Sequence, residues 1–331
     1  TRIKVMANMD IAEKRIPQDG RITLRVEGKT IDVRVASLPT AYGEKLTLRL
    51  LDRSARLITL EELGFPSDYL EKYRQVMNLP YGFILVTGPT GSGKSTTLYS
   101  TLVELNSPEK HIITLEDPIE RRLEGINQVQ VNIRAGMTFA SGLRSILRND
   151  PDIVMVGEIR DHETARIAVE SALTGHLVLS TLHTNDAAGA VTRLGDMGIE
   201  PYLTSSSLAG VVAQRLMRVL CDNCKKPEKL CKADVLNSVP DFPLDPGEDE
   251  ITLYRPEGCM RCNNTGYRGR TGAYELLTMS ENIQKMILSR SSTNVIKQAA
   301  VEEGMITLRQ DGLLKVKKGI TSLEELLRVI I

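Results

Sequence analysis

A charge surplus of either sign is missing from this sequence. Its 42 Lys and Arg residues balance its 42 Asp and Glu residues, which leaves a formal net charge of zero and a pI near 6.9. A protein whose main partner is nucleic acid needs excess basic charge to neutralise phosphates. We therefore expect no direct nucleic-acid partner, although a local basic face is compatible with the overall balance.

Long apolar runs are missing too. The longest ones, such as 83–86 and 153–156, have the length of a β-strand, whereas a membrane-spanning helix needs about 20 apolar residues. The sequence therefore predicts no transmembrane segment, and it lacks the charged and then apolar start of a signal peptide. The chain opens at Thr1 inside a patterned region, so we expect its natural N-terminal part to be missing.

The remaining composition is that of an ordinary globular protein. The 331 residues are 41% apolar and 25% charged, which excludes disorder and predicts roughly two domains. In residues 1–52, three runs at 21–26, 31–35 and 46–50 alternate apolar and polar side chains. This period of two predicts a small antiparallel sheet domain, and we expect a linker at 53–57 to follow it.

From residue 58 the pattern changes to helices alternating with short apolar strands. Such alternation is typical of a parallel α/β sheet with helices on its faces. We expect this α/β domain to span 58–220, a module with paired cysteines to occupy 221–275, and helices to complete the domain at 276–331. Within the cysteine module, residues 238–250 are expected to form a loop. The expected strands are 82–87, 111–116, 152–157 and 177–183, and the expected helices are 95–105, 140–148 and 162–173.

A glycine-rich segment lies between the strand 82–87 and the helix that begins near Ser95. Residues 88–95 fit the pattern G-x-x-x-x-G-K-[ST], in which backbone N–H groups surround phosphate oxygens and a helix N-terminus adds positive charge. Lys94 would reach the β and γ phosphates, and Ser95 would hold Mg²⁺. No N-K-x-D motif for guanine occurs, which favours ATP over GTP. The expected nucleotide-binding residues here are Gly88, Pro89, Thr90, Gly91, Ser92, Gly93, Lys94, Ser95 and Thr96.

Two acidic residues end predicted strands of this sheet. Glu158 follows an apolar strand, where P-loop enzymes keep a ligand for the metal or the water, and Glu116 ends another strand. Because the carboxyl ends of parallel strands lie at one edge, we expect both acids to converge beside the γ-phosphate, with Ser95 and Glu158 serving Mg²⁺. His183 ends a further strand, where a phosphate-sensing role and an ordinary structural role are equally open.

Several arginines are candidates to neutralise the transferring phosphoryl group. Arg144 and Arg148 are four residues apart on one predicted helix face, and Arg160 lies close behind the second strand acid. A solvated surface is the ordinary interpretation of each. Arg34 and Arg49 fall on the polar side of the N-terminal sheet, from which an arginine finger would link ATP hydrolysis to the angle between the two domains.

The cysteines are few but paired. Cys221 and Cys224 form one C-x-x-C pair, Cys259 and Cys262 form a second, and 34 residues separate the pairs. Two such pairs in turn-rich settings offer four thiolates to a tetrahedral Zn²⁺ ion. Because sulfur fills all four positions, we expect this zinc to hold a fold and not to catalyse. Cys231 is left over as a plain thiol.

Five stretches of the chain resemble motifs of one family, the secretion ATPase superfamily, and specifically the motors of type II secretion and type IV pilus assembly. In that family they correspond to an N-terminal-domain segment, the Walker A loop, the Asp box, the Walker B strand and the His box. The stretches are residues 11–21, 88–96, 114–120, 156–161 and 174–185.

The resemblance implies an architecture and further site residues. It implies a RecA-like P-loop ATPase domain with a zinc-binding insertion, joined by a linker to a PAS-like sheet domain, with six copies in a ring. Pilus retraction motors and conjugation ATPases generally lack the tetracysteine module. The domain that docks onto the membrane platform is expected to be missing from this chain. The arginines that would surround the nucleotide in the closed state are Arg34, Arg49, Arg144, Arg148, Arg160 and Arg270.

These expectations combine into a hexameric motor that hydrolyses ATP. Domain closure on ATP would assemble the site, Glu116 or Glu158 would position the attacking water, and an inner-membrane platform protein would turn the motion into extrusion of a pilus or pseudopilus. Such a motor is cytoplasmic and peripheral at the inner membrane through its partners. Pilus assembly and type II secretion both stay open, and the alternatives are a retraction or DNA-uptake motor, a RecA-like DNA translocase, and a nucleotide-binding scaffold without turnover.

Overall fold

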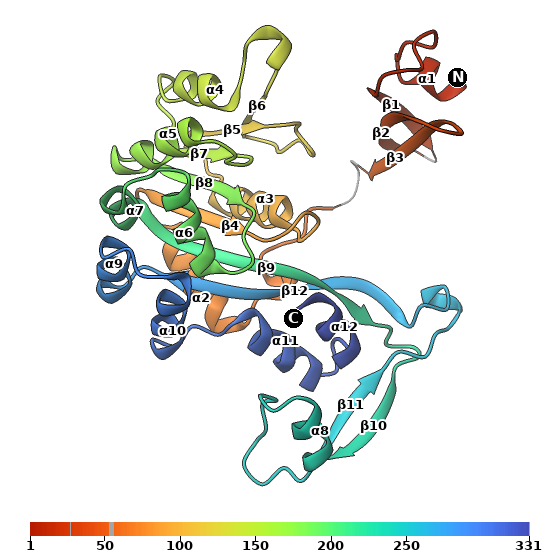
Figure 1. The fold of residues 1–331 in the computed structure, drawn as a ribbon, viewed down its shortest axis with the longest axis vertical. Helices are drawn as coiled ribbons and strands as arrows, with labels where there is room; N and C mark the ends of the chain where they lie inside the picture. Colours follow the sequence, from red (N-terminus) through yellow and green to blue (C-terminus); the bar gives the residue numbers. More distant parts are fainter. Residues whose placement is uncertain (27, 53–55, 331) are drawn as a thin grey trace. The chain divides into compact units, whose positions relative to one another are not determined.

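The chain folds into two compact units (Figure 1). The computed structural model describes residues 1–26, 28–52 and 56–330. The first unit comprises Thr1–Leu57 with Pro118–Arg122, and the second comprises Ile58–Asp117 with Leu123–Ile331. Of the linker predicted at 53–57, residues 53–55 lie outside the described part. Among the described residues, no helix is both long enough and apolar enough to cross a membrane.

The first unit is a small antiparallel sheet with one short helix, α1 (Arg2–Met6). Its strands β1 (Gln18–Val26), β2 (Lys29–Thr40) and β3 (Gly43–Asp52) pair in that order, which confirms the predicted antiparallel sheet. The core covers only part of the predicted apolar face, because Leu48 and Leu50 of β3 are 48% and 70% exposed. Within this unit, α1 packs against β1 at the opposite edge. The buried core residues are Ala7, Met9, Ile22, Val33 and Val35.

The second unit is built on a larger sheet with helices packed around it (Figure 1), which confirms the predicted α/β class. In the described residues this sheet has seven strands in the order β12-β9-β4-β8-β7-β5-β6. All neighbouring strands are parallel except β9 and β12, which are antiparallel. The strands are β4 (Gly82–Thr87), β5 (Ile112–Glu116), β6 (Asn127–Gln130), β7 (Ile153–Val156), β8 (Leu177–Leu182), β9 (Leu208–Leu220) and β12 (Tyr267–Thr278).

The strands and helices of this unit follow the apolar pattern closely. Strands β4 and β8 are buried along their whole length, as expected for central parallel strands covered on both faces. The predicted helix 140–148 ends earlier, at Ile146, because Asp150 has a φ of +46° and Pro151 follows it. Arg148 therefore lies beyond the helix. The helices are η1 (Glu61–Leu63), α2 (Ser67–Met77), α3 (Lys94–Leu105), η2 (Ile133–Ala135), α4 (Phe139–Ile146), α5 (His162–Leu173), α6 (Ala187–Asp196) and α7 (Pro201–Ser207).

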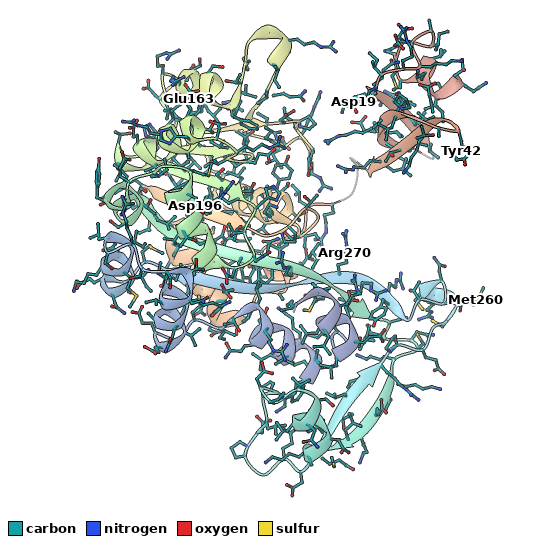
Figure 2. The ribbon with its side chains drawn as sticks, viewed as in Figure 1. Asp19, Tyr42, Glu163, Asp196, Met260 and Arg270 are labelled. Carbon is teal, nitrogen blue, oxygen red and sulfur yellow. The ribbon has the colours of Figure 1, made fainter. Side chains whose placement is uncertain are left out.

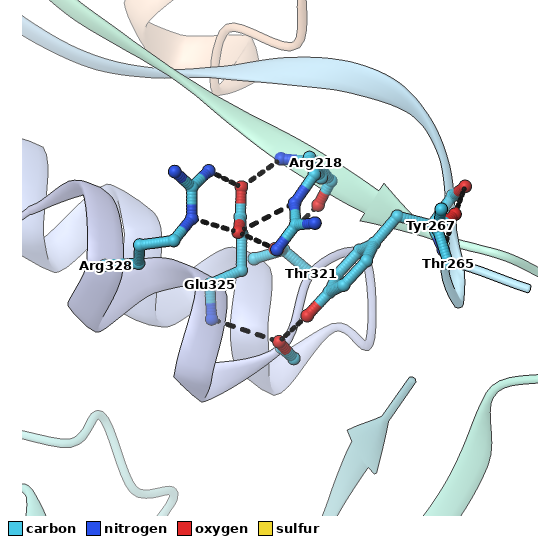
Figure 3. A network of polar contacts seen from close by, with 7 residues as sticks. Arg218, Thr265, Tyr267, Thr321, Glu325 and Arg328 are labelled. Carbon is cyan, nitrogen blue, oxygen red and sulfur yellow. Dashed lines mark hydrogen bonds and ion pairs between the residues drawn. The ribbon is translucent and has the colours of Figure 1, made fainter. Parts of the chain in front are cut away.

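The C-terminal helices lie below β9 and β12 in the view of Figure 1. A polar cluster fixes the last of them to the sheet (Figure 3), where the fully buried Glu325 accepts hydrogen bonds from Arg218 Nη2 and Arg328 Nη2 at 2.7 Å each. The Tyr267 hydroxyl of β12 lies 2.7 Å from Ser322 Oγ at the start of the same helix. The four helices are α9 (Glu281–Leu288), α10 (Thr293–Glu302), α11 (Leu308–Lys317) and α12 (Leu323–Val329).

The chain between β9 and β12 forms an arm with its own secondary structure. Two antiparallel strands build it, and the predicted loop 238–250 is only its tip between a helix and the second strand. The arm packs on α11, because Asp241 pairs with Arg309 at 2.6 Å and Glu248 pairs with Lys317 at 2.8 Å. Its apolar residues Val235, Val239, Phe242, Ile251 and Leu253 belong to the main core. Its elements are β10 (Lys226–Cys231), α8 (Lys232–Ser238), β11 (Glu250–Arg255) and η3 (Met260–Cys262).

Candidate functional site

The loop predicted to bind phosphate, residues 88–95, is called the phosphate-binding loop below and connects β4 to α3. Its backbone needs glycine, since Gly88, Gly91 and Gly93 have φ angles of +146°, +80° and +91°. A Cβ atom on Gly88 would lie only 2.4 Å from the backbone oxygen of Gln214. Gly93 is the N-cap of α3, so the partial positive charge of the helix N-terminus is directed at the loop.

Lys94 lies folded back on this loop. Its Nζ donates hydrogen bonds to the carbonyl oxygens of Gly88 at 2.8 Å and Pro89 at 3.1 Å. Burial lowers the pKa of Lys94, and the charge of Glu158 acts in the opposite direction. Nearby, Ser92 Oγ is buried and finds no hydrogen-bond partner among the described residues. The loop therefore offers an ammonium group and an unsatisfied hydroxyl to an anion.

Glu116, at the end of β5, is held by a set of donors that sequence reasoning missed. The side chain is only 4% exposed, and its Oε1 accepts hydrogen bonds from Thr114 Oγ1 at 2.6 Å and Gln128 Nε2 at 3.0 Å. The Tyr99 hydroxyl of α3 donates to Oε2. The carboxylate is thus fixed in one orientation. The spacing of Thr114 and Glu116 on one strand face was the only signal available in the sequence.

Glu158 and His183 form a second group beside the loop. Glu158 Oε1 lies 2.6 Å from Arg160 Nη2, and Oε2 lies 3.7 Å from His183 Nε2. Burial lowers the pKa of His183, the charge of Lys94 lowers it further, and Glu158 acts against both. The imidazole is therefore neutral at pH 7. The charges of Lys94, Glu158 and Arg160 all act on His183. The structure therefore places these four predicted residues close together.

Thr184 ties the segment after β8 to the strand that carries the phosphate-binding loop. Its Oγ1 lies 2.8 Å from Thr87 Oγ1, and its backbone N–H donates to the same Thr87 oxygen at 2.9 Å. Thr184 lies in the stretch 174–185 that resembles the His box, but its contact with Thr87 was not predicted, because a hydroxyl at a strand end has no distinctive pattern. The pairing keeps His183 in register with the loop.

The remaining arginines of the second unit have other surroundings. Arg144 donates to Glu163 Oε1 at 2.5 Å, and Arg148 donates to Ser145 Oγ at 3.3 Å. Arg270 is exposed on β12 (Figure 2). Their assignment to the nucleotide stays a prediction.

Two predicted arginines belong to the first unit. Arg34 of β2 and Arg49 of β3 are direct cross-strand partners, and Arg21 of β1 is the partner of Arg34 on the other side. A row of three arginines therefore crosses this face of the sheet. Arg21 has an acidic partner in Asp32.

The four paired cysteines meet at the base of the arm. All four sulfurs lie within 4.8 Å of one another, and the distances from Cys221 to Cys259, Cys224 to Cys262, and Cys259 to Cys262 are 3.9, 3.8 and 3.7 Å. Tetrahedral zinc with bonds of about 2.3 Å requires sulfurs about 3.8 Å apart. The donor set therefore fits Zn²⁺. Cys231 is exposed, lies outside the cluster and contacts Asp234.

Backbone and side-chain donors surround these sulfurs. Cys262 Sγ accepts from the N–H groups of Cys259 at 3.1 Å and Gly266 at 3.2 Å. Burial raises the pKa of the Cys262 thiol, but these two N–H groups together with the neighbouring Cys259 and Cys224 side chains outweigh it and lower the pKa to about 6. Asn223 Nδ2 lies 3.4 Å from Cys259 Sγ. Such donors are typical of the surroundings of metal-bound thiolates.

The fold and the loop at the end of β4 define the class of the chain, which is an α/β protein of the P-loop type. A family match defines the chain more narrowly than this class. Residues 1–328 match the model described as "Type II/IV secretion system protein", and the chain belongs to this family.

Comparison with known proteins agrees with this family. The chain is 55% identical to the Type II secretion system ATPase E of Vibrio cholerae and 54% identical to the Type II secretion system protein E of Pseudomonas aeruginosa. Each match covers 99% of this chain and 64% of the relative, so the chain spans just under two thirds of these relatives.

Solved structures share the fold. The crystal structure of the pilus retraction motor PilT with bound ADP aligns with a TM-score of 0.65 at 29% identity, over 95% of this chain and 77% of that one. The Yersinia pseudotuberculosis ATPase DotB aligns with a TM-score of 0.68 at 20% identity, over 99% and 80%. The second likeness concerns the fold alone.

Proposed function

We propose that the protein is an ATP-hydrolysing motor of type II secretion. The observation that carries the proposal is the convergence of Lys94, Glu158 and His183 beside a glycine-dependent phosphate-binding loop. The names of the curated relatives favour secretion over pilus assembly or retraction. The balanced charge of the chain speaks against a DNA translocase.

Residues 88–96 would hold the nucleotide. Lys94 would exchange the carbonyl oxygens of Gly88 and Pro89 for the β and γ phosphates, a step that burial favours because the ammonium group is poorly solvated. Ser95, half-buried at the start of α3, and Glu158 are the residues that would hold Mg²⁺. When bound, Mg²⁺ would neutralise charge on the phosphates.

The two acids differ in a way that suggests different tasks. Glu116 is fixed by Thr114, Tyr99 and Gln128, and such a rigid carboxylate suits the orientation of an attacking water. Glu158 is bound to Arg160 and lies beside the neutral His183. It suits the metal, and His183 would sense the γ-phosphate through Glu158.

Arg34 and Arg49 are the proposed arginine fingers from the first unit. Two like charges directly opposite each other destabilise a sheet, and a bound phosphate would offset this repulsion. Movement of these two arginines toward the nucleotide would couple domain closure to ATP hydrolysis. Arg144, Arg148, Arg160 and Arg270 are proposed to add positive charge around the nucleotide in the closed state.

The cysteine cluster is proposed to bind structural zinc. Cys221, Cys224, Cys259 and Cys262 supply four sulfurs at tetrahedral spacing, so no ligand position remains for a substrate. The metal would hold the base of the arm and take no part in hydrolysis.

The proposed working form is a homo-hexamer in the cytoplasm. An inner-membrane platform protein of the secretion machine would bind it and receive the motion, which makes the motor peripheral at the membrane. Family membership supports a role in a secretion machine, and the hexamer and the platform partner are what the resemblance of the sequence motifs implies.

Steady-state ATP hydrolysis by Glu116→Gln and Glu158→Gln tests the function. We expect each substitution to lower kcat by about 100-fold or more, and Glu158→Gln also to raise the Mg²⁺ concentration needed for half-maximal rate. The matched control is Glu170→Gln, an exposed acid on α5 that pairs with Arg166, which has no proposed role in the site. An absence of Mg²⁺-dependent hydrolysis in the wild type would refute the proposal, as would unchanged rates in both variants.

A further inference from the structure

Gln214 reaches the phosphate-binding loop from the neighbouring strand. Strand β9 runs parallel to β4, and Ala213 pairs with Thr87, the last residue of β4. Gln214 is therefore the first residue of β9 beyond the end of its neighbour, level with the start of the loop. Its side chain is 1% exposed.

Both ends of the Gln214 amide are occupied. Nε2 donates to the carbonyl oxygen of Ser92 at 2.7 Å, and Oε1 accepts from Thr97 Oγ1 at 2.8 Å. Because the Ser92 partner only accepts, the orientation of the amide is determined. One side chain thus links the loop to the first turn of α3.

The backbone around Gln214 fits the loop just as closely. Its carbonyl oxygen lies 2.4 Å from the position that a Cβ of Gly88 would take, and its Nε2 lies 3.1 Å from that of Gly93. Gln214 therefore leaves no room for a side chain at Gly88 and little room for one at Gly93. Such contact from both backbone and side chain is more than ordinary core packing needs.

The bond to Ser92 sets the direction of the next peptide N–H. In a trans peptide the C=O group and the following N–H point in opposite directions. The Ser92 carbonyl points to Gln214, so the Gly93 N–H points away from β9. This N–H belongs to the unpaired donors at the N-terminus of α3, which are the groups that bind phosphate.

We propose that Gln214 is a positioning residue that holds the Ser92–Gly93 peptide in its phosphate-binding orientation. The inference rests on the proposed nucleotide binding and names a residue outside the family motifs given above. Gln214 acts through the loop and does not touch the nucleotide. Without it the loop would still form, but its N–H groups would no longer be fixed in advance of binding.

The affinity of the protein for ADP tests the inference without requiring ATP hydrolysis. Gln214→Met keeps the length of the side chain and removes both hydrogen bonds. Gln214→Glu keeps the acceptor for Thr97, loses the donor to Ser92 and adds a negative charge near the loop, so Gln214→Met is the decisive variant. We expect both variants to bind ADP about tenfold more weakly by calorimetry. Gln214→Glu should recover part of this affinity as the pH falls, because protonation removes the added charge and restores a donor to Ser92.

The control is Tyr73→Phe. It removes another buried hydrogen bond of α3, the 2.7 Å contact with Thr101 Oγ1, away from the loop. We expect it to lower thermal stability as much as the Gln214 variants do and to leave ADP affinity unchanged. Equal ADP affinity of wild type and Gln214→Met overturns the inference, as does a wild type that binds no ADP. A wild type that binds ADP without hydrolysing ATP refutes the proposed function and leaves the Gln214 comparison decisive.

Discussion

At the scale of single residues, the site is organised by hydrogen bonds around its charged groups. Glu116 has three donors, Lys94 has two carbonyl acceptors, and His183 has a carboxylate within 3.7 Å. Each of these contacts restricts a side chain before any ligand arrives. Preorganisation of this kind lowers the cost of binding and of reaching the transition state.

The pKa of His183 reports on this arrangement. Burial and the Lys94 charge lower it below 6.5, while Glu158 raises it. We expect the His183 ring signals in an NMR titration to have a midpoint below 6.5. Glu158→Gln should move the midpoint lower still, because it removes the opposing charge, and Lys94→Met should move it up. Glu163→Gln should leave the His183 midpoint unchanged. A midpoint that is the same in wild type and Glu158→Gln would contradict the geometry.

At the scale of elements, the C-terminal helix α12 depends on one buried acid (Figure 3). Glu325 accepts from the backbone N–H and guanidinium group of Arg218 on β9 and from Arg328 on its own helix. The Arg218 guanidinium also lies 4.0 Å from the centre of the Tyr267 ring, which adds a cation–π contact. A helix of seven residues has little stability alone, so this cluster fixes its position.

Substitution of Glu325 should therefore destabilise the second unit. We expect Glu325→Gln to lower the free energy of unfolding by about 2–3 kcal/mol at pH 7, as measured by urea denaturation. Glu324→Gln, on the exposed side of α12, is the matched control and should change little.

The loss of unfolding free energy in Glu325→Gln should depend on pH. Burial raises the pKa of Glu325, but the guanidinium groups of Arg328 and Arg218 outweigh it and lower the pKa from 4.5 to about 2. An acid with a lowered pKa stabilises the fold above its unfolded pKa, and this contribution disappears as the pH falls through its folded pKa. The difference between wild type and Glu325→Gln should thus shrink between pH 5 and pH 2. A constant difference would argue against the ion-pair cluster.

The sequence predicted the elements better than their contacts. Strand 82–87 is found as predicted because an apolar run bounded by glycines has few other solutions. Arg148 was placed on a helix that ends before it, because a cap position is set by local φ angles. Tyr99 and Gln214 were missed because each contacts a residue of another element, 17 and 122 residues away in sequence, and periodicity carries no information about such contacts.

At the scale of the whole molecule, four sulfurs connect the arm to the α/β domain. Cys221 follows β9 directly, and Cys262 lies shortly before β12. The cluster therefore joins the two strands at the point where the arm leaves the sheet. Metal bound there would stabilise the folded state by its binding free energy.

Metal analysis of purified protein tests this arrangement. We expect one zinc per chain, and we expect Cys221→Ser or Cys262→Ser to lose it and to lower the thermal unfolding temperature. Cys231→Ser is the matched control, since its sulfur lies outside the cluster, and it should retain both metal and stability. Four free thiols and no metal in the native protein would refute the assignment.

The cysteine cluster holds both ends of the arm at one point, and this bears on how the length of the arm can change in evolution. The cost of closing a longer loop grows only with the logarithm of its length, and the cluster fixes where the arm starts and ends. Outside the residues that pack on α11 and in the core, the arm can therefore change in length without moving β9 or the loop that β9 supports. Changes in the length of the arm are then separated from the geometry of the loop at the end of β4.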